Sequence, residues 1–159
     1  MKLHLSMRVA DLDEAIAFYS GLFGQEPTIL RDGYAKWDVT DPAVNFVVQD
    51  GAAALGLDHL GIQVDTQEEL ATLTDRLRGL DRPMLDVEAT TCCYAKMDKA
   101  WIKGEADEKW EAFLTHSHNE PGFGTDRAHL LDTVAGTEET GTCCGKPKPT
   151  ASCCAPASS

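Results

Sequence analysis

Apolar and polar residues alternate over the first nine positions of the chain. Leu5, Met7 and Val9 face one side of an extended strand, and the polar positions between them, starting at His4, face the other. The spacing of apolar residues then becomes helical up to Gly24, a suitable residue for a helix C-terminus. Three further strands are predicted after this helix, at residues 28–30, 34–39 and 43–48.

The same pattern returns 55 residues later, because the stretch His4-Leu-Ser-Met-Arg-Val9 aligns without a gap with His59-Leu-Gly-Ile-Gln-Val64. A helical segment with capping-box spacing follows each stretch. Three more strands are predicted after the second helix, at residues 84–89, 92–102 and 109–115. The sequence therefore predicts an α+β fold of two fused βαβββ modules, residues 1–55 and 56–118, that pair into a curved, barrel-like cleft.

The composition changes after the second module. Residues 119–159 are rich in Gly, Thr, Glu, Lys, Pro, Ser and Cys, and such a segment buries too little apolar surface to offset its ordering entropy. We predict a mostly flexible, cysteine-containing tail, in which the apolar run 128–134 forms a helical turn or two.

The net charge of the chain limits the kinds of partner that it is expected to bind. The formal net charge is −12, which argues against nucleic acid or an anionic membrane surface as a partner. No apolar stretch approaches the length of a membrane span, and charged residues interrupt the first twenty positions, so neither a membrane segment nor a signal peptide is expected. The expected location is the cytoplasm.

Because they belong to a repeat, the two histidines are candidate ligands, which a single histidine in a strand would not be. His4 and His59 occupy equivalent positions on the polar faces of their strands, so duplication places both near the pseudo-twofold axis. Glu111 is the only acid within the largely apolar stretch 109–115, where a carboxylate is costly unless it is paired or bound to metal. The counterpart of Glu111 in the first module is expected at Asn45, a weak ligand.

These three side chains form the donor set of a non-haem Fe(II) site that activates dioxygen. We therefore predict that the cleft binds a metal through His4, His59 and Glu111. Zn²⁺, Mn²⁺, Ni²⁺ and Co²⁺ also accept these donors, and the sequence does not separate them.

All six cysteines fall in adjacent pairs, and one pair, Cys92-Cys93, lies inside the second module. Paired thiols suit a soft, thiophilic ligand, although chance pairing of free thiols is the simpler interpretation. Neighbouring residues of a regular strand point to opposite faces, so this pair can chelate one atom only from a turn, a bulge or a loop. Residues 89–91, just before the pair, are compatible with a loop that enters the next strand.

Several stretches together carry a resemblance to a known family. They are Phe18-Tyr-Ser-Gly-Leu-Phe-Gly24, Leu57-Asp-His-Leu-Gly61, Thr91-Cys-Cys-Tyr-Ala95, Asp98-Lys-Ala-Trp101 and Trp110-Glu111. With the doubled βαβββ pattern, they resemble the vicinal oxygen chelate (glyoxalase/bleomycin-resistance/dioxygenase) superfamily, and within it the ArsI-type carbon–arsenic lyases.

The resemblance implies an enzyme in which His4, His59 and Glu111 bind catalytic Fe(II) and O₂ is the co-substrate. It also implies that Cys92 and Cys93 bind a trivalent organoarsenical, methyl or aromatic, which is cleaved to arsenite in organoarsenical detoxification. The resemblance is compatible with a homodimer. Two alternatives stay open: a thiol-based resistance protein that binds arsenite or cadmium, and another dioxygenase or isomerase of the superfamily, which would not need the cysteine pair.

Overall fold

The computed structural model describes residues 1–51, 54–92, 95–118 and 130–135. Its elements are β1 (Lys2–Arg8), α1 (Leu12–Phe23), β2 (Ile29–Arg31), β3 (Tyr34–Thr40), β4 (Ala43–Gln49), β5 (Gly56–Val64), α2 (Gln67–Arg78), β6 (Met84–Cys92), β7 (Ala95–Lys103), β8 (Lys109–His118) and α3 (Leu130–Ala135). The predicted βαβββ order therefore occurs twice, and a short helix follows it. None of the helices in the described ranges is long and apolar enough to cross a membrane.

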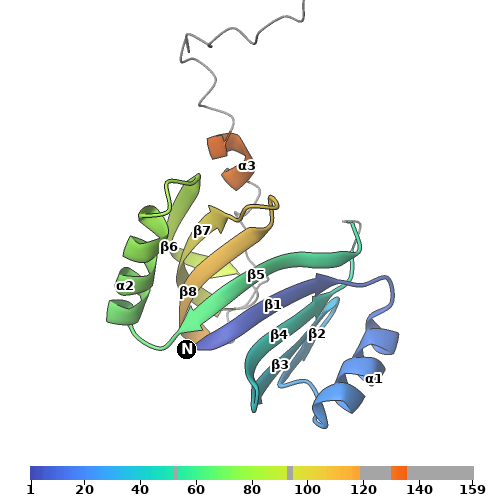
Figure 1. Cartoon of the computed structure of the whole chain (residues 1–159). Helices are drawn as coiled ribbons and strands as arrows, with labels where there is room; N and C mark the ends of the chain where they lie inside the picture. The colour runs from blue at the N-terminus through green and yellow to red at the C-terminus, as the bar shows by residue number, and fades with distance from the viewer. Residues whose placement is uncertain (52–53, 93–94, 119–129, 136–159) are drawn as a thin grey trace, which may run out of the picture.

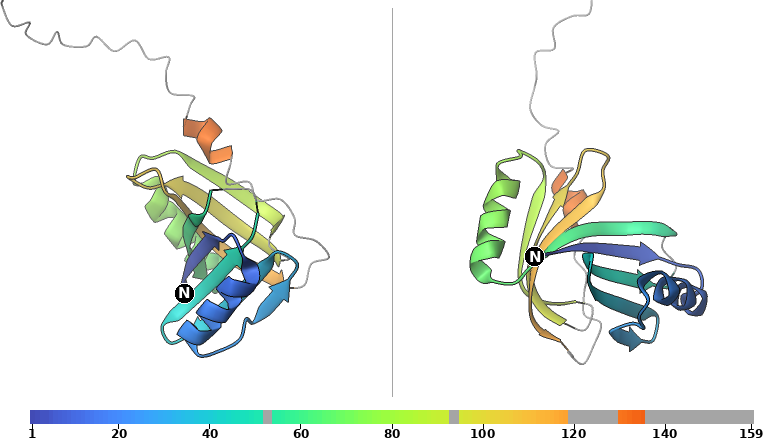
Figure 2. Two further views of the ribbon diagram at one scale, coloured as in Figure 1. Left: turned by 90° about the vertical axis from the view of Figure 1, so that its right-hand side faces the viewer. Right: turned by 60° about the horizontal axis from the view of Figure 1, so that its bottom comes forward.

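The strands form one open sheet in the order β2-β3-β4-β1-β5-β8-β7-β6. Each module occupies one half of the sheet, and the halves meet where β1 pairs antiparallel with β5. The sheet is curled, and α1 covers one half while α2 covers the other (Figures 1 and 2). The predicted α+β fold of two paired modules in a curved arrangement is confirmed.

The two helices begin as their capping residues predict. Asp11 accepts a hydrogen bond from the backbone N–H of Glu14, and Thr66 accepts one from that of Glu69. Under α1, aromatic side chains pack on the apolar face of the first half of the sheet, and under α2 leucines pack on the second. Burying each large apolar side chain stabilises the fold by about 1.5–3 kcal/mol. The apolar side of each half is thus covered, and the polar side faces the interior of the curl.

Residues 89–91 do not form the loop with which their sequence is compatible. β6 continues through these residues to Cys92, which pairs with Ala95 at the start of β7. The register of the pairing shifts between Val87 and Thr90, so the irregularity takes the form of a β-bulge inside the strand. A bulge keeps most of the ladder hydrogen bonds that a loop would forfeit, which explains why the strand persists.

Helix α3 lies within the segment predicted as a tail and matches the helical turns expected there. Leu131 is fully buried and packs with Trp101 and Leu85. Asp132 forms ion pairs with the ammonium groups of Lys103 at 2.9 Å and Lys109 at 3.3 Å. The rest of the tail lies outside the described residues.

We expect Leu131→Ala to lower the free energy of unfolding by about 2–4 kcal/mol, because it leaves a cavity against Trp101. Urea unfolding measures this change. The exposed Thr133 in the same helix is the control, and its replacement by alanine should change stability by less than about 0.5 kcal/mol. Equal effects of the two replacements would show that α3 does not pack on the sheet in solution.

Candidate metal centre

One cavity of about 40 Å³ opens on the side of the sheet opposite to α1 and α2. Its polar lining includes His4, His59, Lys99 and Glu111, contributed by four different strands of both modules. Its apolar wall includes Val47, Met97 and Phe113. The cavity therefore lies where the two modules meet, and both contribute titratable groups to it.

The strand pairing brings the three predicted ligands together around Gly61. This glycine pairs with His4 across β1 and β5 and with Glu111 across β5 and β8, while His59 lies two residues before it on the same strand. A Cβ atom at Gly61 would lie 2.6 Å from Cγ of Glu111. The absence of a side chain at this position therefore makes room for the carboxylate next to the histidines.

The three side chains are buried, and their donor atoms form a compact triangle. Nε2 of His4 lies 3.2 Å from Nε2 of His59, and Oε1 of Glu111 lies 3.4 Å and 3.6 Å from these two nitrogens. A first-row metal ion lies about 2.0–2.2 Å from imidazole nitrogen and carboxylate oxygen, so its donors lie roughly 3.0–3.6 Å apart. The triangle fits one such ion.

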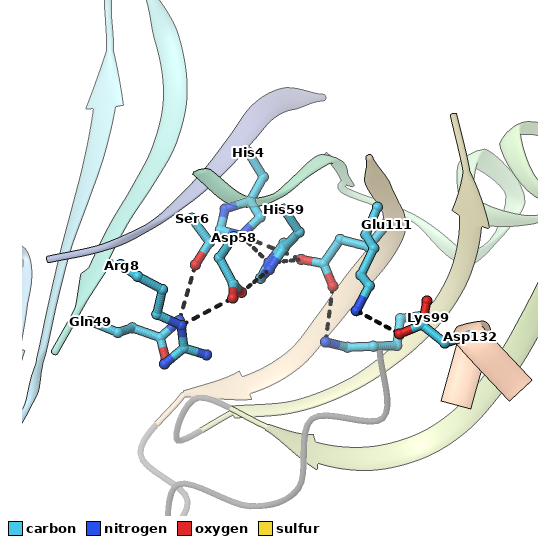
Figure 3. Close-up of polar contacts among 10 residues, drawn as sticks. His4, Ser6, Arg8, Gln49, Asp58, His59, Lys99, Glu111 and Asp132 are labelled. Carbon is cyan, nitrogen blue, oxygen red and sulfur yellow. Dashed lines mark hydrogen bonds and ion pairs between the residues drawn. The ribbon is translucent and has the colours of Figure 1, made fainter. Parts of the chain in front are cut away.

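Nδ1, the nitrogen of each imidazole that points away from the triangle, has its own acceptor, and Figure 3 shows Asp58 in this position beside His59. Nδ1 of His4 lies 2.9 Å from the backbone oxygen of Asn45, and Nδ1 of His59 lies 2.7 Å from a carboxylate oxygen of Asp58. The other oxygen of Asp58 accepts a hydrogen bond of 3.0 Å from Nε of Arg8. An N–H at Nδ1 directs the Nε2 lone pair toward the triangle, as ligation of a metal requires.

The carboxylate of Glu111 divides its two oxygens between different partners. Oε1 faces the histidines, and Oε2 accepts a hydrogen bond of 3.0 Å from Nζ of Lys99, which is also buried. Burial alone would raise the pKa of Glu111, but Lys99 and His59 hold it well below its usual range. Glu111 is therefore a carboxylate throughout the physiological pH range.

The two histidines titrate very differently. Burial lowers the pKa of His4 to about 4, although Glu111 partly opposes it. Burial would also lower the pKa of His59, but the carboxylates of Asp58 and Glu111 raise it to about 9. At neutral pH and without a metal, His59 is therefore the imidazole that carries the additional proton.

The counterpart of Glu111 in the first module is Val47, and the expectation of Asn45 is wrong. Glu111 pairs with the residue two positions after His59, and Val47 pairs with Ser6, two positions after His4. Valine cannot bind a metal, so within the described part of the chain this cluster offers three candidate ligands, His4, His59 and Glu111. Asn45 also lines the cavity, and its buried Oδ1 has no hydrogen-bond partner within the described part of the chain.

Sequence reasoning missed the roles of Asp58 and Lys99. Asp58 can reach Nδ1 of His59 because the pairing of β1 with β5 shifts register at this point, and no pattern in the sequence signals that shift. Lys99 lies inside β7, within the strand predicted at residues 92–102, and its side chain is buried. Its alternation with Met97 and Trp101 was the available signal that it faces the interior.

The structure describes only part of the predicted thiol site. Cys92 is the last residue of β6, and its strand partner Ala95 lines the cavity. Cys93 lies outside the described residues, as do the four cysteines of the tail.

Comparison with known proteins shows the family of this chain. No protein-family model matches it. A trivalent organoarsenical cleaving enzyme from Thermomonospora curvata is 36% identical over 115 residues, which cover 71% of this chain and 76% of that enzyme. The cadmium-induced protein CadI of Mycobacterium tuberculosis is 34% identical over 148 residues, which cover 90% of this chain and 92% of CadI. The chain belongs to the family of the trivalent organoarsenical cleaving enzymes and CadI proteins.

Solved structures show which fold this family adopts. An extradiol ring-cleaving dioxygenase from B. fuscum has a TM-score of 0.56 and 14% sequence identity, and the match covers 82% of this chain and 35% of that longer enzyme. The shared fold is that of the vicinal oxygen chelate superfamily.

For this family member, Asp58→Asn should weaken metal binding about 10- to 100-fold, the usual effect of losing an outer partner of a histidine ligand. The amide can donate to Nδ1 of His59, which would place the ring proton on Nε2 and block ligation. Titration with Co²⁺ measures the loss. Asp65→Asn is the control, because it neutralises an exposed acid just beyond the end of the same strand, β5. Equal Co²⁺ affinity of both variants would remove Asp58 from the site.

Proposed function

We propose that the protein cleaves the carbon–arsenic bond of trivalent organoarsenicals, methyl or aromatic, and releases arsenite in organoarsenical detoxification. Fe(II) would be its resident metal and O₂ its co-substrate. One observation carries the proposal: the buried triangle of His4, His59 and Glu111 shares a cavity with Ala95, the strand partner of the first residue of the vicinal cysteine pair. The organoarsenical-cleaving relatives support the choice of substrate.

In this proposal His4, His59 and Glu111 hold the ion, and the remaining coordination positions stay available. Fe(II) bound there supplies the redox chemistry that activates dioxygen. Val47 faces the cavity at the fourth corner and adds an apolar surface instead of a ligand. The unpartnered Oδ1 of Asn45 can accept a hydrogen bond from a water molecule or from a hydroxyl group in the cavity.

The thiolates of Cys92 and Cys93 would hold the substrate. Trivalent arsenic is soft and prefers sulfur donors, and an arsenical with one organic group has two positions that two thiolates can take. The cysteine pair would thereby place the carbon–arsenic bond beside the three metal ligands, and such positioning is worth several kcal/mol. Ala95, Met97 and Phe113 form an apolar cluster on the same wall, suited to the organic group.

We place this reaction in the cytoplasm, whose reducing thiol pool keeps a vicinal cysteine pair in the thiol form. The acidic chain is not expected to bind nucleic acid or a membrane surface.

A second candidate function is a thiol-based resistance protein that sequesters arsenite or cadmium. The likeness to the cadmium-induced protein CadI over most of the chain favours it. Sequestration would need the cysteines but would have no use for the buried triangle of imidazoles and carboxylate. The third possibility, another dioxygenase or isomerase on this fold, would need the triangle but not the cysteines.

Speciation of arsenic after one reaction cycle separates these functions. The Fe(II)-loaded protein is mixed without oxygen with an equimolar trivalent methylarsenical and exposed to air. Gel filtration then separates the protein from unbound small molecules, and arsenic is speciated in the denatured protein and in the unbound fraction. We expect arsenite as the product. Recovery of bound but intact methylarsenical would indicate sequestration, and recovery of unbound methylarsenical would indicate a different reaction on this scaffold.

Metal binding should also depend on pH. The ion must displace the proton that Asp58 and Glu111 retain on His59 by raising its pKa to about 9. Below that pH, the apparent affinity for Co²⁺ should therefore rise about tenfold per pH unit, and it should level off above it. Titrations at pH 6.5, 7.5 and 8.5 measure this slope. An affinity that is constant across these values would show that His59 is neutral before the metal binds.

A further inference from the structure

The two oxygens of Glu111 are not equivalent in the folded chain. Oε1 faces both imidazoles, while Oε2 accepts the hydrogen bond of Lys99 at 3.0 Å (Figure 3). The side chains of Lys99 and Glu111 are each only 4% exposed, so water does not screen this ion pair. A carboxylate whose second oxygen is held in this way meets an ion with one oxygen only.

The position of Lys99 is defined by the strand and by its neighbour. It lies in the middle of β7, and its ammonium group lies 5.1 Å from the ring centroid of Trp101. The ring of Trp101 in turn meets the ring of His59 edge-on, with 5.1 Å between centroids. Lys99 therefore belongs to a packed set of side chains that surrounds the metal ligands.

We propose that Lys99 is a positioning residue that restricts Glu111 to single-oxygen ligation and thereby keeps one coordination position open for substrate or dioxygen. This inference rests on the proposed function, because it assumes the metal at His4, His59 and Glu111. A glutamate freed from its lysine can turn and bind a metal through both oxygens, which would occupy that position.

The positive charge of Lys99 determines how its removal should change the affinity for a metal ion. The ammonium group of Lys99 repels a divalent ion bound by Glu111, so its removal does not weaken metal binding. A residue that merely supports the fold would have the opposite signature, since its loss would loosen the site and reduce both affinity and activity. Lys99 is thus expected to separate metal affinity from turnover.

The test replaces Lys99 by methionine, which keeps the length of the side chain and removes its charge. Lys99→Arg is the conservative variant, and Lys99→Gln is a second neutral variant for the case that the methionine variant does not fold. Lys103→Met is the matched control, because this lysine lies on the same strand but forms ion pairs with Asp107 and Asp132. Each protein is titrated with Co²⁺, whose visible absorption reports the number of ligands.

We expect Lys103→Met and Lys99→Arg to keep the wild-type absorption spectrum. Lys99→Met should bind Co²⁺ at least as tightly as the wild type, with a spectrum of altered coordination, while arsenite release by its Fe(II) form falls tenfold or more. A wild-type spectrum in Lys99→Met, or a tenfold loss of Co²⁺ affinity, would overturn the role of Lys99 alone. Failure of the wild-type protein to bind Co²⁺ would overturn the metal site itself, and this role with it.

Discussion

Replacing His4, His59 or Glu111 singly by alanine is expected to abolish Fe(II) binding at stoichiometric protein concentration and to reduce turnover to background. Each side chain supplies one corner of a buried donor triangle, and two remaining corners do not hold a labile divalent ion. Because the loss of an outer partner alone costs about 10- to 100-fold in affinity, the loss of a ligand should exceed about a hundredfold. Iron bound per chain after anaerobic gel filtration is the measurement.

Two further variants make this result specific. His116→Ala removes an exposed histidine that forms an ion pair with Asp98, and it should keep full iron binding. Glu111→Gln preserves the shape of the side chain but removes its charge, so it should lose iron while the fold is retained. Full Fe(II) affinity in Glu111→Ala would exclude Glu111 as a ligand.

Replacing Cys92 or Cys93 by serine should impair the binding of the arsenical and not the binding of iron. Iron binding should stay nearly unchanged, because the three metal donors remain. Affinity for a trivalent organoarsenical should fall on the order of a hundredfold or more, about 2.7 kcal/mol, because a hydroxyl is a hard and poorly ionised donor where arsenic prefers a thiolate. The rate of carbon–arsenic cleavage should fall together with this affinity. Arsenical titration with iron monitored separately measures both effects.

The tail provides the control for the cysteine variants. Serine at both Cys153 and Cys154 should leave the turnover number unchanged, because we assign these thiols no part in the chemistry. An unchanged arsenical affinity in Cys92→Ser would refute dithiolate binding of the substrate and would favour a conventional dioxygenase or isomerase on this fold.

The fold and the approach of His4 to His59 could be predicted because they follow from the repeat. Two strand histidines 55 residues apart in a duplicated pattern have to approach each other once the modules pair, and His4 and His59 do. Glu111 could be predicted for a different reason, since a lone acid in an apolar strand needs a partner. Both arguments use only local pattern and symmetry.

The remaining features depend on strand register, which the pattern does not specify. Alternation assigns Asn45 and Val47 to the same face, and only the pairing of β1 with β4 shows that Val47 is the counterpart of Glu111. The ion pair of Lys99 with Glu111 likewise depends on how β7 lies beside β8. The bulge in β6 is a local shift of register and leaves no trace in the spacing of apolar residues.

Catalytic release of arsenite tests the proposed enzyme most directly. The protein is incubated with an excess of trivalent methylarsenical in four samples, with and without Fe(II) and with and without O₂, and arsenite is counted per chain. We expect more than one arsenite per chain only where both Fe(II) and O₂ are present. Equal arsenite in the sample without iron or in the sample without oxygen, or no arsenite in any of them, would contradict an iron- and oxygen-dependent carbon–arsenic lyase.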